Sequence, residues 1–556
     1  MFRSTVIAFV ALLLAVSPVA GLLRHGVVGE DMRFVELSAA PDAALASVVS
    51  GSFDEDVLKT GWATLRVASS GAYSNEQQAR AAGVFEGALT ADLIDEFVAA
   101  NYPAGTPTAQ LQLDKKAYAF VVKQFAWVRV TALKNANTSD YWAQIHLQMV
   151  QMEGIAAGYL QDNPLSSNPI TALDVYLLSG SDSVEDIMTG VQFNSAPLKK
   201  PFVNEQAVGS HCSALVRFTG TDLFTAHATW TGYDQMLRIM KEYKLQYTRN
   251  DGSPVPGSLI QFSSYPGSIW SSDDFYQIGT GAPMNLAVWE TTSSVYNTTL
   301  WQSLSTSTVL TFMRVQAANR LATSGPNWAQ WFKMFHSGTY TNAWMVVDYS
   351  LFRARADPST LDANTAYMIE ELPGLTAEGD MTDFINTAGY FASFNVWFFQ
   401  ETYVASATPY MVEKHGPWFS FDGCPRNLIF AREAPKTQTL SDVQRLMRFN
   451  EWNTDPLSSF PQRSPANTIA SRKDLAPTNV SYTIEYIRPE CDGAIDAKVT
   501  SDGLMQAAQF TAVAGPTWGG KNNLPPFDWS SAAPICQKML HNGQPTLFNY
   551  NYVGFF

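Results

Sequence analysis

Apolar residues recur at helical spacing in several long stretches of the chain. Between residues 75 and 101, alanine, leucine and phenylalanine return every three or four positions, behind Ser74, which is suited to cap a helix. Tyr102-Pro103 ends this pattern, because proline cannot continue a helix. The same spacing predicts helices at 114–135, 140–160, 231–246 and 308–321, and a capping box at 441–444 predicts one more, carrying Leu446 and Met447.

Short apolar runs bounded by turn residues predict strands. These runs lie at 173–178, 213–218, 223–229 and 345–349. Strands and helices are mixed without a repeated strand–helix–strand period, and no internal repeat is visible. The pattern therefore favours an α+β fold over a doubly wound parallel sheet.

A polar, proline-containing stretch at 194–210 is typical of an exposed linker that tolerates proteolysis. It ends where the strand-like run 213–218 begins, and Cys212 stands at this junction. If the peptide bond before Cys212 breaks, that residue carries both a thiol and a free α-amine. The amine has an ordinary pKa of about 7.7–8.0, so it is suited to act as the base for its own thiol. This arrangement points to a self-processing hydrolase.

Residues 1–21 have the pattern of a secretory signal peptide. Arg3 precedes an apolar run at 6–16 that is too short to span a bilayer, and small residues up to Gly21 offer a cleavage site. No later apolar run reaches the length of a membrane helix. We therefore expect a secreted or lysosomal protein with no integral membrane segment. Three glycosylation sequons agree with this route, at Asn137, Asn297 and Asn479.

Composition narrows the partners further. Only 15% of the residues are charged while 46% are hydrophobic and 13% aromatic, which favours a large buried core. The formal charge of −14 argues against nucleic acid and against electrostatic docking on anionic membranes. An oxidising compartment permits disulfides, so two bridges using all four cysteines compete with one bridge that leaves Cys212 free. The count alone favours two bridges among Cys212, Cys424, Cys491 and Cys536.

Several familiar motifs are absent or incomplete. The stretch 515–522 approaches a phosphate-binding loop but lacks the final Ser or Thr, and Pro525-Pro526 prevents the helix that should follow. A plain turn is the better interpretation. The chain has no G-x-S-x-G, H-E-x-x-H or paired C-x-x-C motif, so we expect no serine elbow, no metal and no cofactor.

Three polar residues are candidates for work beside Cys212. His227 could return next to it in a hairpin, although a histidine in such a run is more often buried and bonded to backbone. Asn395 could donate to an oxyanion, or it could tie down a loop. Arg426 could bind an acidic head group or a carboxylate, or it could pair with a nearby acid.

Segments spread over the mature chain carry a family resemblance. They lie at 61–62, 81–86, 211–215, 226–230, 289–292, 342–349, 390–395, 425–426, 445–450, 492–500 and 515–518. In order and spacing they resemble the phospholipase B-like family of secreted and lysosomal N-terminal nucleophile hydrolases. Two positions depart from the usual family pattern, because Ala228 stands where Asn is common and Ala343 where Gln is common.

The resemblance implies an αββα sandwich that cleaves itself between His211 and Cys212. The fragments 22–211 and 212–556 would remain one folded unit. The implied pocket has Cys212, His227 and Asn395 as catalytic residues, and Trp230, Thr291 and Arg426 as substrate-binding residues. Under the same resemblance we expect a single disulfide, Cys491–Cys536, with Cys424 unassigned, and a homodimer is compatible with it.

The implied activity is hydrolysis of fatty-acyl esters of glycerophospholipids through a thioester on Cys212. Before cleavage, the linker 194–211 would occupy the pocket, so processing would also activate the enzyme. Two alternatives stay open. One is an amidase that acts on N-acyl amides, and the other is a lipid-binding protein with little turnover.

Overall fold

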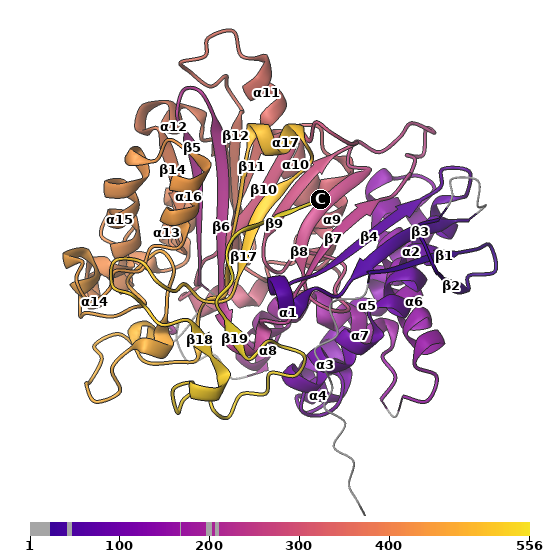
Figure 1. The fold of residues 1–556 in the computed structure, drawn as a ribbon, viewed down its shortest axis with the longest axis horizontal. Coiled ribbons are helices and arrows are strands. Elements are labelled where there is room, and N and C mark those ends of the chain that lie inside the picture. Colours follow the sequence, from indigo (N-terminus) through magenta and orange to yellow (C-terminus); the bar gives the residue numbers. More distant parts are fainter. Residues whose placement is uncertain (1–22, 42–46, 167, 196–202, 206–210) are drawn as a thin grey trace, which may run out of the picture.

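The computed structural model describes residues 23–41, 47–166, 168–195, 203–205 and 211–556 (Figure 1). The predicted signal peptide, residues 1–21, and much of the predicted linker, residues 196–202 and 206–210, lie outside the described residues.

Eleven strands of the described chain form one large sheet. Their order is β13 (Leu375–Asp380), β12 (Ala366–Leu372), β11 (Asn342–Asp348), β10 (Leu286–Thr292), β9 (Phe275–Gly279), β8 (Leu259–Ser264), β7 (Ile239–Lys244), β4 (Ala63–Ser69), β3 (Val49–Asp54), β1 (Leu23–Val28) and β2 (Phe34–Leu37). Strands β4 and β7 pair in parallel, and the other neighbours are antiparallel. Because β1–β4 precede Cys212 and β7–β13 follow it, both sides of that residue build the sheet.

A second sheet, seven-stranded within the described ranges, carries Cys212. Its order is β14 (Tyr390–Ser393), β5 (His211–Phe218), β6 (Leu223–Gly232), β16 (Asp496–Ser501), β17 (Phe510–Ala514) and β20 (Val553–Phe555), with β15 (Asp492–Ala494) also paired to β6. Strands β5 and β6 form the predicted hairpin, in which Cys212 lies opposite Thr229. A separate pair is formed by β18 (Phe527–Asp528) and β19 (Leu547–Phe548).

Helices α1–α10 contribute apolar residues to one core cluster with the large sheet. They are α1 (Val57–Thr60), α2 (Asn75–Leu89), α3 (Ala91–Asn101), α4 (Pro107–Leu111), α5 (Lys115–Asn135), α6 (Asp140–Asp162), α7 (Ala172–Ser179), α8 (Ser181–Ser195), α9 (Thr311–Leu321) and α10 (Gly325–Phe332). The remaining helices are α11 (Tyr349–Ala354), α12 (Thr382–Ala388), α13 (Gln400–Ala405), α14 (Thr408–His415), α15 (Pro425–Glu433), α16 (Leu440–Met447) and α17 (Asp502–Gln506). Of these, α15 and α16 pack on the outer face of the second sheet.

The two sheets face each other across apolar clusters. Val216 of β5 packs with Trp289 and Met345 of the large sheet in one cluster, and Trp62, Phe275 and Phe510 belong to another. The order of layers is therefore helices, large sheet, second sheet and helices (Figure 1). This mixed arrangement confirms the α+β prediction.

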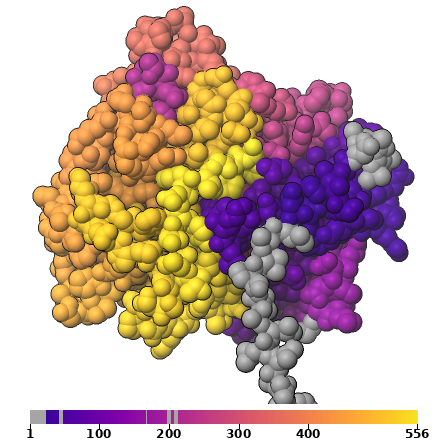
Figure 2. Space-filling view, viewed as in Figure 1, coloured from indigo at the N-terminus to yellow at the C-terminus, as the bar shows by residue number. Residues whose placement is uncertain are grey.

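The first and last described segments lie side by side. On the face in Figure 2 the indigo N-terminal part borders the yellow C-terminal part. The rings of Trp62 and Phe555 are 6.2 Å apart, and the Tyr550 hydroxyl donates to the Val57 carbonyl over 3.3 Å. Residues before and after Cys212 thus share one core.

Two predicted elements were wrong in type. Residues 173–178, predicted as a strand, belong to helix α7, which opens with a capping box between Thr171 and Asp174. A six-residue apolar run does not distinguish the two states, and the capping box decides it. Residues 231–246, predicted as a helix, instead form a short 3₁₀ turn and strand β7. The polar Lys241 of β7 is buried and bonds Glu86 over 2.7 Å, so its apparent helical pattern was misleading.

Other helices are confirmed with altered ends. Ser74 caps α2 as predicted, but the predicted helix 75–101 is divided between α2 and α3 at Thr90. The capping box before Leu446 joins Thr439 to Asp442, two residues earlier than predicted. None of the helices described is long and apolar enough to cross a bilayer.

One disulfide, Cys491–Cys536, is present as the family resemblance implied. Cys212 and Cys424 are both buried and unbridged, so the two-bridge interpretation from cysteine count was wrong. Cys212 is the second residue of β5 in the second sheet, while the bridge joins the residue directly before β15 to Cys536. The Cys212 thiol is therefore available for chemistry.

Candidate active site

The backbone of Cys212 is held on both sides by predicted site residues. Its N–H donates to Asn395 Oδ1 over 3.0 Å, and its carbonyl accepts from Arg426 Nη1 over 2.6 Å. Cys212 itself is only 2% exposed. The fold thus brings to Cys212 two residues that lie 183 and 214 positions further along the sequence.

Asn395 and Arg426 also contact each other. Arg426 Nη1 donates to Asn395 Oδ1 over 2.7 Å, and Asn395 Nδ2 donates to the Thr292 carbonyl over 2.5 Å. Asn395 has a left-handed φ of 70°, a conformation that Asn tolerates better than most residues. Its amide is therefore fixed between the nucleophile strand and the large sheet.

Arg426 is buried against protein acceptors. Its Nη2 donates to the Phe394 carbonyl over 2.6 Å, and its guanidinium lies 4.5 Å from the centre of the Trp230 ring. The Trp230 indole N–H donates to the Ile469 carbonyl over 3.2 Å. In this conformation the polar groups of Arg426 and Trp230 are bonded to protein carbonyls, so both residues support the backbone around the site.

Strand alternation separates the site into two faces. Cys212 and Thr229 are paired across the hairpin, and His227 lies two positions before Thr229 in β6, so all three share the face toward the large sheet. Ser213 lies on the opposite face, where Arg426 approaches its hydroxyl to 3.5 Å. The thiol therefore belongs to the space between the sheets.

His227 lies fully buried in that space, opposite Ala214 in the hairpin, while Thr229 takes the position opposite Cys212. Its Nδ1 is 3.5 Å from Thr229 Oγ1, and it lies opposite Lys498 of β16 in the strand register. Burial, followed by the nearby positive charge of Lys498, lowers the pKa of His227 well below its ordinary value. The imidazole is therefore neutral even in a mildly acidic compartment.

Thr291 links the two sheets at the site. Its hydroxyl lies 2.5 Å from the hydroxyl of Ser393 in β14. Ala343, where the family often has Gln, lies directly opposite Thr291 in the β10–β11 ladder. Ala228 faces the helices that cover the second sheet, so the two departures affect different faces of the site.

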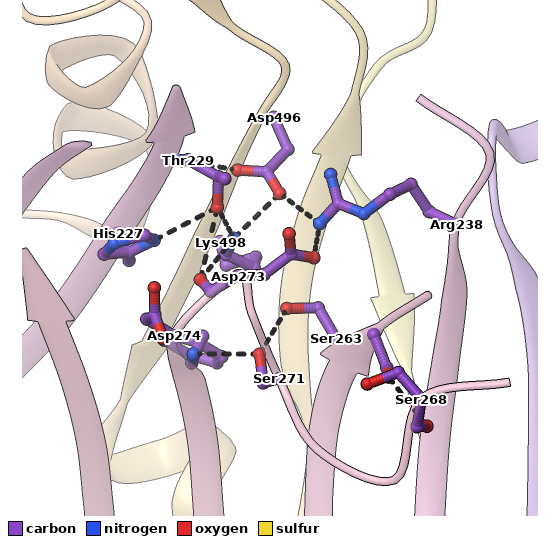
Figure 3. A network of polar contacts seen from close by, with 12 residues as sticks. His227, Thr229, Arg238, Ser263, Ser268, Ser271, Asp273, Asp274, Asp496 and Lys498 are labelled. Carbon is purple, nitrogen blue, oxygen red and sulfur yellow. Dashed lines mark hydrogen bonds and ion pairs between the residues drawn. The ribbon is translucent and has the colours of Figure 1, made fainter. Parts of the chain in front are cut away.

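A buried charge network lies beside His227 and Thr229 (Figure 3). Lys498 Nζ donates to Asp496 Oδ2 over 2.7 Å and to Thr229 Oγ1 over 2.7 Å. Arg238 Nη2 lies 2.8 Å from Asp496 Oδ2 and also pairs with Asp273. This network was missed from the sequence, although two charged residues at alternate positions of an apolar strand, 496 and 498, are a signal for it.

Two further buried carboxyls, Asp274 and Glu290, interact electrostatically with Cys212. The Tyr340 hydroxyl is 2.7 Å from Asp274 Oδ2 and 3.0 Å from Glu290 Oε1, but its single proton serves one acceptor at a time. Burial raises the pKa of both carboxyls, and their mutual repulsion adds to the rise for Asp274.

These surroundings keep the Cys212 thiol protonated in the intact chain. Burial raises its pKa well above the ordinary value, and the negative charge of Glu290 adds to the rise. A backbone hydrogen bond from Trp230 and the positive charge of Lys498 act in the opposite direction. Attack by Cys212 therefore needs a base close to its own sulfur.

A narrow cavity of about 20 Å³, room for about one water molecule, adjoins Asn395 and Arg426. Its other walls are largely aromatic, with Tyr296, Phe394, Trp397, Trp418, Phe419 and Tyr486. Val203, one of the described linker residues, packs on part of this aromatic cluster. Its neighbour Asn204 donates its N–H to the Tyr296 carbonyl over 2.8 Å, so a short piece of the linker lies beside the cavity.

The remaining sequence candidates are the turn at 515–522 and the three sequons. Residues 519–524 form a turn closed by two backbone hydrogen bonds, in agreement with the interpretation of 515–522 as a turn. Asn137 and Asn479 are exposed, which suits glycosylation. The Asn297 amide donates to the Ala405 carbonyl over 3.0 Å and would have to be released to carry a glycan.

Buried acids predict an unusual pH dependence of stability. Burial raises the pKa of Glu370 and Asp186 to about 7 and that of Asp182 to about 8. Each holds a proton in the folded chain where the unfolded chain has lost it, so their stabilising contribution is complete below about pH 4 and is lost as pH rises to about 8. We expect the Tm to fall between about pH 6.5 and about pH 8, measured by differential scanning fluorimetry, and Glu370→Gln to flatten the fall. A Tm that rises over this interval would contradict the assignment.

Comparison with known proteins gives a consistent family. The family model described as Phospholipase B matches residues 49–555. "Putative phospholipase B-like 2" of Bos taurus is 36% identical over 92% of this chain and 85% of that protein. "Putative phospholipase B-like 1" of Caenorhabditis elegans is 34% identical over 94% of this chain and 90% of that protein. "Phospholipase B-like protein A" of Dictyostelium discoideum is 32% identical over 91% of this chain and 88% of that protein.

Proposed function

Because the chain belongs to the phospholipase B family, we propose that it hydrolyses fatty-acyl esters of glycerophospholipids through a thioester on Cys212. The observation that carries the proposal is the double hold on the Cys212 backbone by Asn395 and Arg426. It fixes the residue whose thiol and amine would perform the reaction. The layered fold with Cys212 at the start of an inner strand supports assignment to the N-terminal nucleophile type.

The first step of the proposal is cleavage between His211 and Cys212. The Cys212 sulfur attacks the His211 carbonyl carbon, and the peptide C–N bond breaks as its nitrogen takes the thiol proton. Water then hydrolyses the resulting thioester, which leaves a carboxylate on residue 211 and a free thiol and amine on Cys212. The two fragments would stay together, since strands from both sides of Cys212 share the large sheet.

The second step is turnover of substrate. The freed amine, which retains Asn395 Oδ1 as its acceptor, takes the thiol proton. The thiolate attacks the acyl carbonyl, the alcohol leaves with a proton from the ammonium, and water hydrolyses the thioester to release the fatty acid. Asn395 would stabilise the oxyanion, and the neutral His227 would orient the thiol or the substrate.

The family name and the walls of the cavity support the proposed substrate class. Aromatic side chains beside the polar Asn395 and Arg426 would suit an acyl chain that ends in a carbonyl, once departure of the linker widens a cavity that has room for about one water molecule in the intact chain. In the intact chain Val203 and Asn204 lie next to this cavity, which supports a linker that blocks access before cleavage. Secretion or delivery to lysosomes would supply the compartment for this processing.

Product analysis tests the proposal. Processed protein is incubated with mixed phosphatidylcholines and, in parallel, with N-acyl ethanolamines at acidic pH, and products are identified by mass spectrometry. We expect free fatty acids and lysophospholipids or glycerophosphocholine from the ester arm, with less product from the amide arm. Faster amide cleavage would assign an amidase, and lipid that copurifies without any product would assign a lipid-binding protein.

A further inference from the structure

We propose that Lys498 is a positioning residue that aligns the Cys212 hairpin and supplies the positive charge that stabilises the Cys212 thiolate. The inference rests on the proposed nucleophilic role of Cys212. It assigns a part in that role to a residue of β16, about 290 positions along the chain from the nucleophile.

Lys498 is completely buried, and its hydrogen bonds fix the position of its ammonium group. Nζ donates to Asp496 Oδ2 and to Thr229 Oγ1, each over 2.7 Å, and to the Asp273 carbonyl over 3.2 Å. An ammonium group has three N–H donors, so these three acceptors satisfy it completely. The side chain therefore has one well-defined location between the sheets.

Thr229 connects Lys498 to the strand that carries Cys212. It pairs directly with Cys212 across the β5–β6 ladder, and its N–H donates to Asp496 Oδ1 over 2.9 Å. Its hydroxyl accepts from Lys498 and lies 3.5 Å from His227 Nδ1 (Figure 3). Lys498 and Asp496 therefore fix both the backbone and the side chain of the residue opposite Cys212.

Charged and titratable groups reach the thiol from several elements. They are Lys498 and Asp496 of β16, Glu290 of β10, Asp274 before β9, Tyr340 before β11 and Arg426 of α15. Arg426 binds the Cys212 carbonyl and approaches Ser213 on the opposite face of the strand. Among these groups, Lys498 is the cation on the face that the thiol occupies.

The positive charge of Lys498 counters the effect of two nearby acids, Glu290 and Asp274, on the Cys212 thiol. Glu290 raises the pKa of the Cys212 thiol and Asp274 faces the same group, so ionisation of Cys212 adds a negative charge near two carboxyls. In a buried site such repulsion is poorly screened. The positive charge of Lys498 opposes it, and its effect on the thiol exceeds that of its partner Asp496.

The charge balance of the network explains why a buried lysine is tolerated. Arg238 and Lys498 carry two positive charges, and Asp273 and Asp496 carry two negative charges. Coulombic attraction to Lys498 and Arg238 lowers the pKa of Asp496 to about 2, so the pair remains ionised in an acidic compartment. The cation beside Cys212 is thus present under lysosomal conditions.

Three variants test the proposal. Lys498→Met removes the charge at similar length, Lys498→Arg retains the charge, and Asp496→Asn/Lys498→Met removes both partners and leaves the Arg238–Asp273 pair balanced. Burial lowers the pKa of Lys498 to about 8, so its charge is tested below that pH. Thiolate character of Cys212 is followed between about pH 6 and about pH 7 as its rate of alkylation by iodoacetamide, read from the peptide mass. This reading requires neither self-cleavage nor a substrate, so it stays valid if the proposed hydrolysis fails.

We expect Lys498→Met to lower the alkylation rate of Cys212 about tenfold, and to slow self-cleavage about tenfold at the same pH by intact mass. The double variant should show a smaller loss in the same direction, and Lys498→Arg should remain near wild type. An unchanged or faster alkylation of Cys212 in the Met and double variants would overturn the proposal. A double variant that fails to fold would also overturn it, because the pair would then be needed for the fold alone.

Discussion

Replacing Cys212 by alanine is expected to leave the chain uncleaved and without hydrolytic activity. The methyl group has no nucleophile for the His211 carbonyl and none for a substrate, so both reactions lose their first step. The loss in turnover should reach the detection limit, which is at least about a thousandfold for removal of a covalent nucleophile. Intact mass spectrometry of the purified protein detects the processing, and release of fatty acid measures the activity.

Two further variants show whether this result is specific to the Cys212 thiol. Cys424→Ala removes another thiol that is also 2% exposed, and we expect that variant to cleave itself as the wild type does. Cys212→Ser supplies a weaker nucleophile in the same position, and cleavage should slow rather than stop. If Cys212→Ala still separates into the same two fragments, another protease makes the cut and self-cleavage is refuted.

The strands around Cys212 were predictable because their signal is local. Two apolar runs joined by a short turn predict a hairpin, and the β5–β6 ladder has that form. The errors at α7 and β7 have a different origin. The run at 173–178 fits either state until the Thr171 capping box is recognised, and Lys241 of β7 looks solvent-facing until its partner Glu86 is known.

The site residues fall into the same two groups, those with a local sequence signal and those without one. Cys212 and His227 lie on the two strands of a predicted hairpin, whereas Asn395 and Arg426 were candidates with a structural alternative left open, and only the family resemblance grouped them with Cys212. The Lys498 network depends on Arg238 and Asp273, which lie far from it in the sequence. Such pairing is decided by how two sheets face each other, and a strand pattern carries no information about that.

Removing the Asn395 side chain is expected to cost the enzyme about a hundredfold to a thousandfold in kcat/KM, the usual loss for one oxyanion donor. Asn395→Gly is the appropriate change, because the backbone φ of 70° suits glycine and would strain alanine. The variant loses the acceptor of the Cys212 N–H and of Arg426 Nη1 together with the donor to Thr292. Steady-state kinetics on the processed fraction should show the loss mainly in kcat.

Asn395→Asp separates the two parts of this role. The carboxylate keeps an acceptor for the Cys212 amine and for Arg426, but it replaces the donor near Thr292 by an oxygen that repels the carbonyl. We therefore expect self-cleavage to persist while hydrolysis falls nearly as far as in Asn395→Gly. A glycine variant within tenfold of wild-type kcat/KM would remove Asn395 from the mechanism, and the Arg426 contact with the Cys212 carbonyl would then be the remaining hold on the nucleophile.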